Sequence, residues 1–424
     1  MFDSSVDLKL SPKKAATSSP SVNTTFVAVM IGLSAAHLFC GYEFIRSTSN
    51  TLYKDVYGQR LPQVMVVVPF AVVAALCLYS RLLSWLGPRK TLLATSLLSS
   101  AGIFACYGAI QAGATSATFA LYVLRETYIV LLVEQYWSFL NSSLGDSAAK
   151  KLYGPICGIG SLGAIAGGLL LGELTKPLGK ENMLLFAAGA ILPAALFSEL
   201  AYRRCGEPVR ATEEEQRQKD HLGLRLFGRH RMLIVLLLII IATQMISVTQ
   251  DWIWQGILSA EIPDSTEQNQ YSGRFFALLN AAAFVGQFFI TPLLLRFVPL
   301  LWMHIAIPLV NLAACATLFG TPSLATAGAA YLLFKTMDYS IFRAAKEILY
   351  IPFPFDVRYR AKEIIDVFGY RFGKGALALP FTILAGAKIA ISGMTYAVVA
   401  GSAAIVWVCL AIPLVWFFRR KQQG

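Results

Sequence analysis

Residues 203–231 read RRCGEPVRATEEEQRQKDHLGLRLFGRHR, the longest polar stretch in a chain that is otherwise largely apolar. The 424 residues are 56% hydrophobic and 14% charged, and the mean hydropathy is +0.60. These values lie outside the range of soluble globular proteins and within that of polytopic membrane proteins. The polar stretch therefore predicts a loop between two groups of membrane spans.

Apolar segments on both sides of this stretch are long enough to cross a bilayer, since a helix needs about 20 apolar residues to span a ~30 Å hydrocarbon core. Their runs are continuous, which predicts α-helices and not the short alternating strands of a barrel. Six segments precede the polar stretch and six follow it. The predicted spans are 25–46, 61–84, 91–112, 115–141, 153–175, 183–202, 232–257, 272–295, 299–319, 323–342, 364–387 and 393–418.

The predicted fold is an all-α polytopic membrane protein with twelve transmembrane helices in two six-helix halves. This is the plan of the major facilitator fold, in which substrate lies near the midplane between the halves and rocking alternates its access. The predicted regions are an N-terminal tail at 1–24, an N-terminal half at 25–202, a linker at 203–231, a C-terminal half at 232–418 and a C-terminal tail at 419–424.

The basic charges are distributed unevenly between the two sides of the predicted membrane. Of the 36 Lys and Arg, 25 lie on the side of the N-terminus, 5 on the opposite side and 6 within the spans. By the positive-inside rule both termini are predicted to be cytoplasmic, with a bacterial inner membrane as the expected location. The net charge of +12 is thus a topology signal. The expected partners are the lipid bilayer and a small anionic substrate, with no nucleic acid, and the protein is expected to be a monomer.

The cysteines and histidines indicate neither a metal site nor disulfides. The seven cysteines are odd in number, lie mostly in apolar spans and have no paired spacing, while the four histidines form no HxxxH or Cys/His cluster. No nucleophile and base pair or phosphate-cradling Walker loop is present. The sequence therefore predicts no metal, no cofactor and no enzyme activity.

The fifth predicted span contains a glycine-rich segment, YGPICGIGSLGAIAGGLLLGEL at 153–174. Small residues one helical turn apart allow a neighbouring helix backbone to approach closely, so tight helix packing is predicted. An alternative is a similarity to the glycine-rich fifth helix of proton-coupled drug exporters. The Gly-x-x-x-Gly pairs are Gly154 with Gly158, Gly163 with Gly167, and Gly168 with Gly172.

Ionisable residues within the spans are candidate functional groups, because each costs about 2.5–3.5 kcal/mol on insertion scales and must face a pore, a partner or a substrate. Lys335 and Asp338 are three apart on a helix and are predicted to pair, as are Lys362 and Asp366. Adjacent side chains project about 100° apart, so Glu126 is predicted to find its partner on another helix and not in Arg125. The candidate charges are Glu43, Arg46, Arg125, Glu126, Glu134, Asp251, Arg274, Lys335, Asp338, Arg371 and Lys374.

Arg371 and Lys374 form a predicted anion site. They share a helix face, where two cations repel each other unless an anion or facing carboxylates lie between them. An arginine fork and a lysine charge, with Gly373 and Gly375 exposing the backbone, suit a phosphate or a carboxylate. The alternative is that both side chains extend to lipid headgroups.

Residues 340–375, SIFRAAKEILYIPFPFDVRYRAKEIIDVFGYRFGKG, resemble the signature of the nucleotide transporter family, the ATP/ADP translocases of plastids and intracellular bacteria. IRSTSNTLY at 45–53 and LYVLRET at 121–127 resemble the family's segments in helices one and four. The resemblance implies a major-facilitator-like carrier for nucleotides. It also implies functional positions at Arg46, Glu126, Asp251, Lys335 and Lys374; Asp251 stands where the family usually has Glu.

The chain departs from the family pattern at several charged positions. Ser49, Gln255 and Asp338 stand at positions where the family has lysine, and Glu43 is an additional acid. The candidate charges named above are then six cations and five acids, with a net charge of about +1. A nucleoside monophosphate, another singly phosphorylated metabolite or a zwitterion fits this balance better than ATP.

Three hypotheses about function follow. The first is a carrier for a nucleotide or a related phosphate-bearing metabolite, by ATP/ADP-type exchange among other modes. In it the substrate-binding residues are Arg46, Glu126, Asp251, Lys335, Arg371 and Lys374, and the gating or proton-coupling candidates are Glu43, Asp338 and Asp366. The second is a proton-coupled carrier of a drug, siderophore or lipid. The third is a membrane sensor or assembly protein that keeps a carrier fold, since fold alone does not establish function.

Overall fold

The computed structural model describes residues 24–143, 146–206, 230–320, 322–351, 353, 365, 369–387, 389 and 391–423. Every regular element within these residues is a helix. Each predicted span overlaps a described helix, although the helix ends differ. Most of the predicted linker and the N-terminal tail lie outside the described residues.

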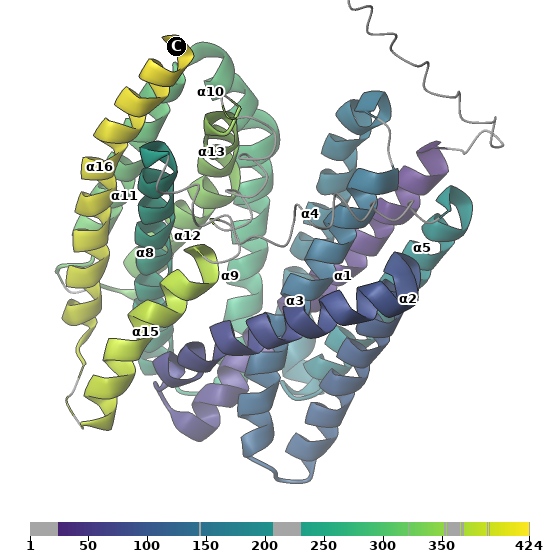
Figure 1. The fold of residues 1–424 in the computed structure, drawn as a ribbon. Helices are drawn as coiled ribbons and strands as arrows, with labels where there is room; N and C mark the ends of the chain where they lie inside the picture. The colour runs from purple at the N-terminus through teal and green to yellow at the C-terminus, as the bar shows by residue number, and fades with distance from the viewer. Residues whose placement is uncertain are drawn as a thin grey trace, which may run out of the picture.

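The helices before the linker form one group (Figure 1). Helix α1 packs against α4 and α5, and α2 packs against α3 and α5. Helix α2 contains the predicted spans 61–84 and 91–112 and bends at Gly87, whose φ of 76° is a conformation that glycine adopts without strain. The helices of this group are α1 Thr24–Tyr57, α2 Leu61–Gln111, α3 Ser116–Ser143, α4 Asp146–Leu178 and α5 Met183–Cys205.

The helices after the linker form a second group, which Figure 1 shows beside the first in teal to yellow. Helix α8 packs against α12, α15 and α16. Two π-helical turns, η1 and η2, continue α9 into α10 and α12 into α13. The elements are α8 Arg231–Glu261, α9 Ser265–Val285, η1 Gly286–Ile290, α10 Thr291–Phe297, α11 Leu300–Ala316, α12 Leu324–Met337, η2 Asp338–Phe342, α13 Arg343–Leu349, α15 Tyr370–Gly386 and α16 Gly393–Gln423.

Length and composition make these helices suited to a bilayer. Among the described residues, eight helices are long and apolar enough to cross a membrane, and Leu300–Ala316 and Phe372–Gly386 are shorter apolar helices. Large apolar side chains lie on the outside, for example Phe70, Trp302 and Ile412. Lipid tails can cover such side chains, whereas water cannot do so favourably.

Local capping fixes where the connecting turns end. Asp264 precedes α9, and its Oδ1 accepts hydrogen bonds from the backbone N–H groups of Thr266 (2.7 Å) and Glu267 (2.9 Å). These two donors stabilise the ionised carboxylate and lower the pKa of Asp264. Ser323 begins α12 with a reciprocal capping box to Thr326.

Glycines on α4 set the distance between helices on two of its faces. A Cβ built on Gly163 would lie 2.2 Å from the carbonyl oxygen of Ala36 on α1, and one on Gly167 would lie 2.5 Å from that of Cys40. Side chains cannot occupy such space, so the prediction of tight packing is confirmed for this pair. A Cβ on Gly154, by contrast, meets nothing within 4 Å.

The second glycine face of α4 joins the two groups of helices. A Cβ on Gly168 would lie 2.8 Å from the backbone nitrogen of Ala277 on α9. A Cβ on Gly273, also on α9, would lie 2.7 Å from the backbone nitrogen of Gly172 on α4. Helices α15 and α2 also pack across the groups, as do α1 and α9. The two groups therefore meet along α4 with α9 and α15 with α2.

Candidate functional site

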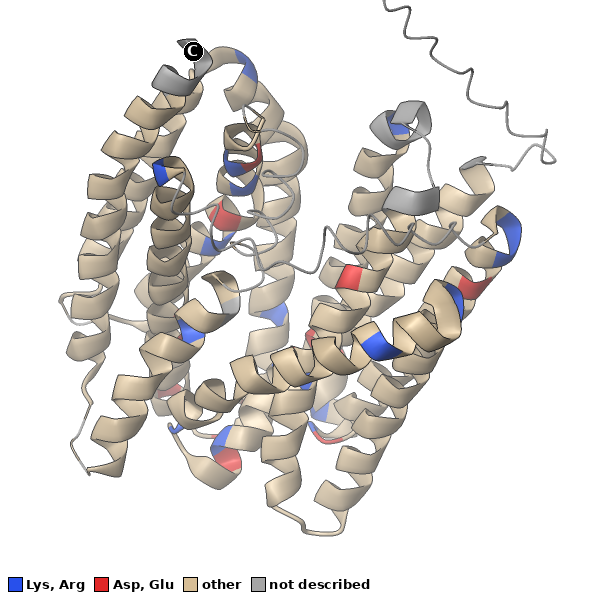
Figure 2. Cartoon of the chain, viewed as in Figure 1, with Lys and Arg blue, Asp and Glu red and all other residues tan. Residues whose placement is uncertain are grey.

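Charged residues are sparse along the helices (Figure 2), so those in the interior are individually informative. Arg46 of α1 lies 3.6 Å from Oε1 of Glu43, and its guanidinium lies 3.7 Å from the ring centroid of Phe276 on α9. Asn280, also on α9, donates to the same Oε1 at 3.0 Å. Oε2 of Glu43 is buried and has no hydrogen-bond partner among the described residues. The pair thus lies at the boundary between the two groups of helices.

Arg125 of α3 is held by several acceptors. Its Nη1 donates to Oγ of Ser49 at 3.1 Å and to Oδ1 of Asn50 at 2.7 Å, and also to the backbone oxygen of Arg46 at 3.0 Å. Its Nη2 donates to Oε1 of Glu126 at 2.7 Å. The prediction that these neighbours do not pair is wrong, because the long arginine stem lets the guanidinium fold back even though the two Cβ atoms diverge.

Lys335 of α12 is a buried cation that has no acid partner among the described residues. It is 5% exposed, and in the part of the chain that the structure describes no carboxylate lies within 4.0 Å of its Nζ. Aromatic rings surround it instead: Nζ lies 5.0 Å from the ring centroid of Tyr339, 5.9 Å from Phe334 and 6.0 Å from Tyr331. Cation–π attraction compensates only a part of the cost of burying this charge.

The predicted pair of Lys335 with Asp338 is wrong. Asp338 is buried, and its Oδ1 has no hydrogen-bond partner among the described residues. The π turn η2 begins at Asp338, so the helix changes its winding at this residue and the regular three-residue spacing no longer applies. Lys335 extends toward Tyr339 instead.

Asp251 of α8 lies near the same centre. It is half-buried and within electrostatic range of Lys54, of Tyr122 on α3 and of Tyr331 on α12. Tyr331 also lies beside Arg46, which connects Asp251 to the α1 charges. We call Glu43, Arg46, Arg125, Glu126, Asp251 and Lys335 the central charged cluster.

Two other charges that the sequence placed within spans lie elsewhere. Arg274 pairs with Glu173 at 2.9 Å, and both side chains are exposed. Lys374 is half-buried on α15. Asp366 and the side chain of Arg371 lie outside the described residues, so the anion site predicted at Arg371 and Lys374 stays a prediction.

The glycines beside Lys374 serve helix packing. A Cβ on Gly375 would lie 2.6 Å from Cγ of Pro69 on α2, and one on Gly373 would lie 3.3 Å from Cβ of Gln244 on α8. The prediction that they expose backbone to an anion is therefore wrong, because neighbouring helices occupy this space.

Lys54, near the end of α1, is a functional candidate that sequence reasoning missed. It is 8% exposed, and its Nζ donates to Oε1 of Gln255 (2.9 Å), Oγ of Ser259 (3.0 Å) and Oε1 of Gln268 (3.0 Å). Gln255 and Ser259 lie on α8 and Gln268 lies on α9. The sequence placed Lys54 in a loop, since the apolar run ends at residue 46, but α1 continues to Tyr57. The sequence feature that could have indicated the longer helix is the polar run 47–51, whose side chains are buried in the structure.

Further contacts surround Lys54 at the same end. Lys180 donates to Oδ2 of Asp55 at 2.7 Å and also to Ser265. Asn269 of α9 donates to Thr48 at 3.2 Å and to Thr175 at 3.3 Å. We call the contacts of Lys54, Lys180 and Asn269 the closed-end contact. It joins the two groups of helices at the end opposite the C-terminus, where α1 and α8 end (Figure 1).

Lys54→Met is expected to weaken the closed-end contact, because it removes the charged donor of three hydrogen bonds and keeps the apolar stem. A hydrogen bond to a charged group contributes about 1.5–3 kcal/mol, part of which the desolvation of the ammonium offsets. We expect a net shift of about 2 kcal/mol, or roughly 30-fold, toward the state in which this end is open. Spin labels at Ala114 and Ser392, in a variant without native cysteines, measure the separation.

Lys176→Met is the matched control, since Lys176 is an exposed lysine near the end of α4 at the same end of the molecule. It is expected to leave the label distances unchanged. Equal distance distributions in Lys54→Met and the unaltered protein would show that Lys54 does not hold this end closed.

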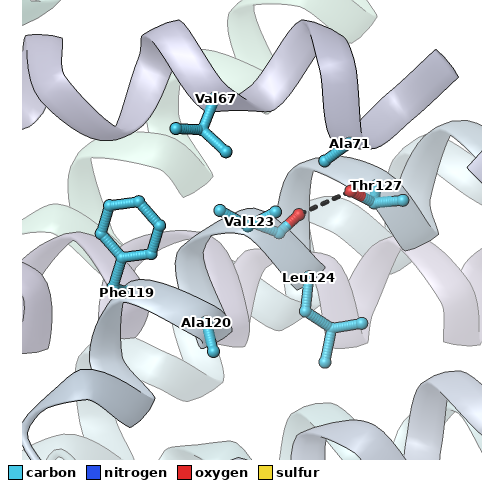
Figure 3. Close-up of a pocket in the computed structure, with 7 residues that line it drawn as sticks. All are labelled: Val67, Ala71, Phe119, Ala120, Val123, Leu124 and Thr127. Atoms are coloured by element: carbon cyan, nitrogen blue, oxygen red, sulfur yellow. Dashed lines mark hydrogen bonds between the residues drawn. The ribbon is translucent and has the colours of Figure 1, made fainter. Parts of the chain in front are cut away.

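A hollow of about 450 Å³ lies between α2 and α3 (Figure 3). Its one hydroxyl, that of Thr127, donates to the carbonyl oxygen of Val123 at 2.7 Å. None of the described residues that line it is charged, so these residues offer no cation to a phosphate. The lining residues are Val67, Ala71, Phe119, Ala120, Val123, Leu124 and Thr127.

Comparison with known proteins supports the resemblance drawn from the sequence. The chain is 22% identical over 316 residues to ADP,ATP carrier protein 3 of Rickettsia felis, a match that covers 62% of each chain. It is 24% identical over 308 residues to ADP,ATP carrier protein 1 of Chlamydia pneumoniae, covering 61% of this chain and 59% of that one. The chloroplastic ADP,ATP carrier protein 1 of Arabidopsis thaliana is 26% identical over 312 residues, covering 63% of this chain and 49% of that one. The chain spans less than two thirds of the length of these relatives.

Solved transporter structures share the fold. A variant of the nucleoside transporter NupG superposes with a TM-score of 0.68 at 14% identity, covering 92% of this chain and all of that one. A bacterial homologue of the iron transporter ferroportin, in an inward-facing state, has a TM-score of 0.67 at 13% identity, with 92% and 98% covered. The fold is thus the helical fold of major facilitator transporters, and the protein is a multi-pass membrane protein.

The family match covers most of both groups of helices. Residues 63–422, from the start of α2 to the end of α16, match the family described as TLC ATP/ADP transporter. The charged positions that the resemblance singled out on α8, α12 and α15 lie within this range. The chain therefore belongs to the TLC ATP/ADP transporter family.

Proposed function

We propose that this protein is an alternating-access carrier of a nucleotide or a related phosphate-bearing metabolite. The observation that carries the proposal is Lys335, a buried cation with rings around it and no described carboxylate within 4.0 Å. An uncompensated charge in the bilayer interior is costly, so such a lysine is retained where an anion binds it. The family of the chain supports a nucleotide as that anion.

The pairing within the central charged cluster bears on the charge of the substrate. Arg46 lies beside Glu43, and Arg125 pairs with Glu126, so each of these guanidinium groups already has a carboxylate. Lys335 then supplies the cation of the cluster that a substrate can neutralise. We infer that a substrate with few negative charges, such as a nucleoside monophosphate or ADP, is bound more readily than ATP.

Several finer features belong to the same proposal. Twelve transmembrane helices form two six-helix halves, 25–202 and 232–418. Both termini are cytoplasmic, and the membrane is a bacterial inner membrane. The carrier acts as a monomer. Arg371 and Lys374 provide further phosphate contacts, with Asp251 as an opposing acid and Asp338 and Asp366 in gating. Exchange of one nucleotide for another is the proposed mode, since the named relatives are ADP,ATP carriers.

Uptake into proteoliposomes tests the proposal. Vesicles loaded with unlabelled AMP, ADP or ATP and supplied with the labelled form are expected to show counterflow, which an exchanger performs without a net gradient. The same nucleotides are expected to raise the unfolding temperature of the purified protein by mass action. No counterflow and no thermal shift with any of them, or with other phosphorylated metabolites, would contradict a nucleotide carrier.

A second candidate is a proton-coupled carrier of a non-nucleotide solute. The observation that favours it is Glu43, which is 3% exposed and has one carboxylate oxygen without a described partner. A buried carboxyl beside the boundary between the halves is a suitable place for a proton to bind and leave. Solute flux that follows an imposed proton gradient, in vesicles that ignore nucleotides, would identify this function instead.

A further inference from the structure

The hollow between α2 and α3 lies between two facing rows of side chains (Figure 3). Val67 and Ala71 are four residues apart on α2, and Ala120, Leu124 and Thr127 are three or four apart on α3. Residues at these intervals share one face of a helix. The small side chains of Ala71 and Ala120 lie on opposite walls, and this leaves the space between the two helices open.

The chemistry of the lining suits a hydrocarbon group. The hydroxyl of Thr127 already donates to the carbonyl oxygen of Val123, at 2.7 Å, so it is not available as a donor to a ligand. A volume of about 450 Å³ is within the range of small-ligand sites. Apolar cavities bind apolar groups and exclude water. A nucleotide or another polar ligand would find no partner for its charges among these lining residues.

The hollow lies at the depth of lipid tails. Ala71 is ten residues after Leu61, where α2 begins, and Thr127 is eleven residues after Ser116, where α3 begins. At the rise of an α-helix these positions lie about 15 Å along their helices, which is half of the ~30 Å hydrocarbon thickness. The lining residues are therefore within the hydrocarbon region of the bilayer.

The hollow is also continuous with the surface that lipids cover. Val67 is 40% exposed, and Phe70 and Leu78 on the same helix are 67% and 58% exposed. Ala120 on the opposite wall is exposed as well. In a membrane-spanning protein such apolar side chains face acyl chains. An acyl chain can therefore enter the hollow from the bilayer without passing through the protein.

We propose that one acyl chain of a bilayer lipid binds in this hollow and packs between α2 and α3. The hydrophobic effect does not favour this position over the rest of the bilayer, because lipid tails are as apolar as the lining. The preference comes from dispersion contacts, since an unfilled hollow leaves its lining atoms without partners. A chain between two helices contacts more protein atoms than a chain on one convex helix face.

The proposed lipid site adjoins the closed-end contact. Phe119 lines the hollow, and its ring centroid lies 6.3 Å from that of Tyr53 and 6.4 Å from that of Tyr57 on α1. Lys54, which forms the closed-end contact, lies between these two tyrosines in the sequence. A chain in the hollow therefore contacts a ring that packs on this end of α1.

Photo-crosslinking in vesicles tests the proposal. The protein is reconstituted in phosphatidylethanolamine and phosphatidylglycerol, with a small fraction of phosphatidylethanolamine that carries a diazirine in the middle of one acyl chain. Mass spectrometry of peptides then locates the adducts. Adducts at 67–71 and 119–127 are expected to exceed those at the exposed Ile405 and Ile412 of α16 roughly fivefold, a modest preference because packing alone supplies it.

Two variants fill the hollow from opposite walls, so the test does not depend on one of them folding. Ala71→Phe and Ala120→Leu are each expected to reduce adducts in the hollow to the level of α16. Ala105→Phe is the matched control, since Ala105 is an exposed alanine on α2 that does not line the hollow. It is expected to leave the adducts unchanged.

Three outcomes would overturn the proposal. Equal adducts at the hollow and at α16 would show that lipids only pass over this face. Adducts that persist when the hollow is filled would place the chain elsewhere, and labelled α16 with an unlabelled hollow would mean that something other than a lipid occupies it. Nucleotide uptake is not among these measurements, so their result is independent of the proposed function.

Discussion

Lys335→Met is expected to abolish nucleotide uptake and, at the same time, to raise the unfolding temperature of the substrate-free protein. The two effects have opposite signs because the buried ammonium destabilises the empty protein and binds the substrate when it is present. Loss of one partner of a buried charge pair costs about 2–5 kcal/mol, so affinity is expected to fall at least about 30-fold. Counterflow and thermal unfolding measure the two effects on one preparation.

Lys90→Met is the control for this prediction, because Lys90 is an exposed lysine on α2. It is expected to change neither readout. A Lys335→Met protein that is less stable than the unaltered chain yet still takes up nucleotide would show that Lys335 is a structural residue. Nucleotide-dependent stabilisation is expected to disappear in Lys335→Met and to persist in Lys90→Met.

The apolar pattern predicted where helices lie along the chain more accurately than where they end. The predicted span 183–202 and helix α5 Met183–Cys205 nearly coincide, because hydropathy changes sharply at both ends. The predicted span 25–46 misses the last turns of α1, since residues 47–51 are polar but are buried by other helices. Hydropathy reports transfer into lipid and says nothing about polar surfaces that helices bury against each other.

Pairing between charges was the part that the sequence could not supply. Spacing predicted Lys335 with Asp338 and excluded Arg125 with Glu126, and the structure shows the reverse. The predicted pair of Lys335 with Asp338 was wrong because a π turn begins there, and the residue pattern did not predict that turn. The pair of Arg125 with Glu126 was missed because the long arginine side chain can fold back to its neighbour. Spacing along one helix constrains Cβ directions only.

Two departures from the family pattern have a structural explanation. Ser49 and Gln255 stand where the resemblance implies lysines, and both are acceptors here: Ser49 from Arg125 and Gln255 from Lys54. A lysine at either position would place two cations within hydrogen-bond distance of each other. Arg125 and Lys54 thus place cations beside the two positions where the family has lysines. A count of charges along the sequence could not reveal this.

The second large effect is expected from a single methyl group on α4. Gly163→Ala would place a Cβ 2.2 Å from the carbonyl oxygen and 2.4 Å from Cα of Ala36, both backbone atoms that cannot rotate away. Helices α1 and α4 would have to separate, and α1 carries Glu43 and Arg46. Overpacking of this kind costs about 1–3 kcal/mol and sometimes more. We expect a clearly lower unfolding temperature and a lower yield of folded protein in detergent.

Gly154→Ala, on the same helix, is the matched comparison for Gly163→Ala. Its Cβ would meet nothing within 4 Å, and alanine is favoured over glycine in a helix by about 1 kcal/mol, so the unfolding temperature is expected to stay or rise. Gly158→Ala, whose nearest atom would be Cζ of Phe288 at 3.6 Å, is expected to fall between the two. Both carry the Gly-x-x-x-Gly pattern that Gly163 carries, so the pattern alone predicts equal effects. Equal unfolding temperatures for the Gly154 and Gly163 variants would mean that α1 does not approach α4 this closely.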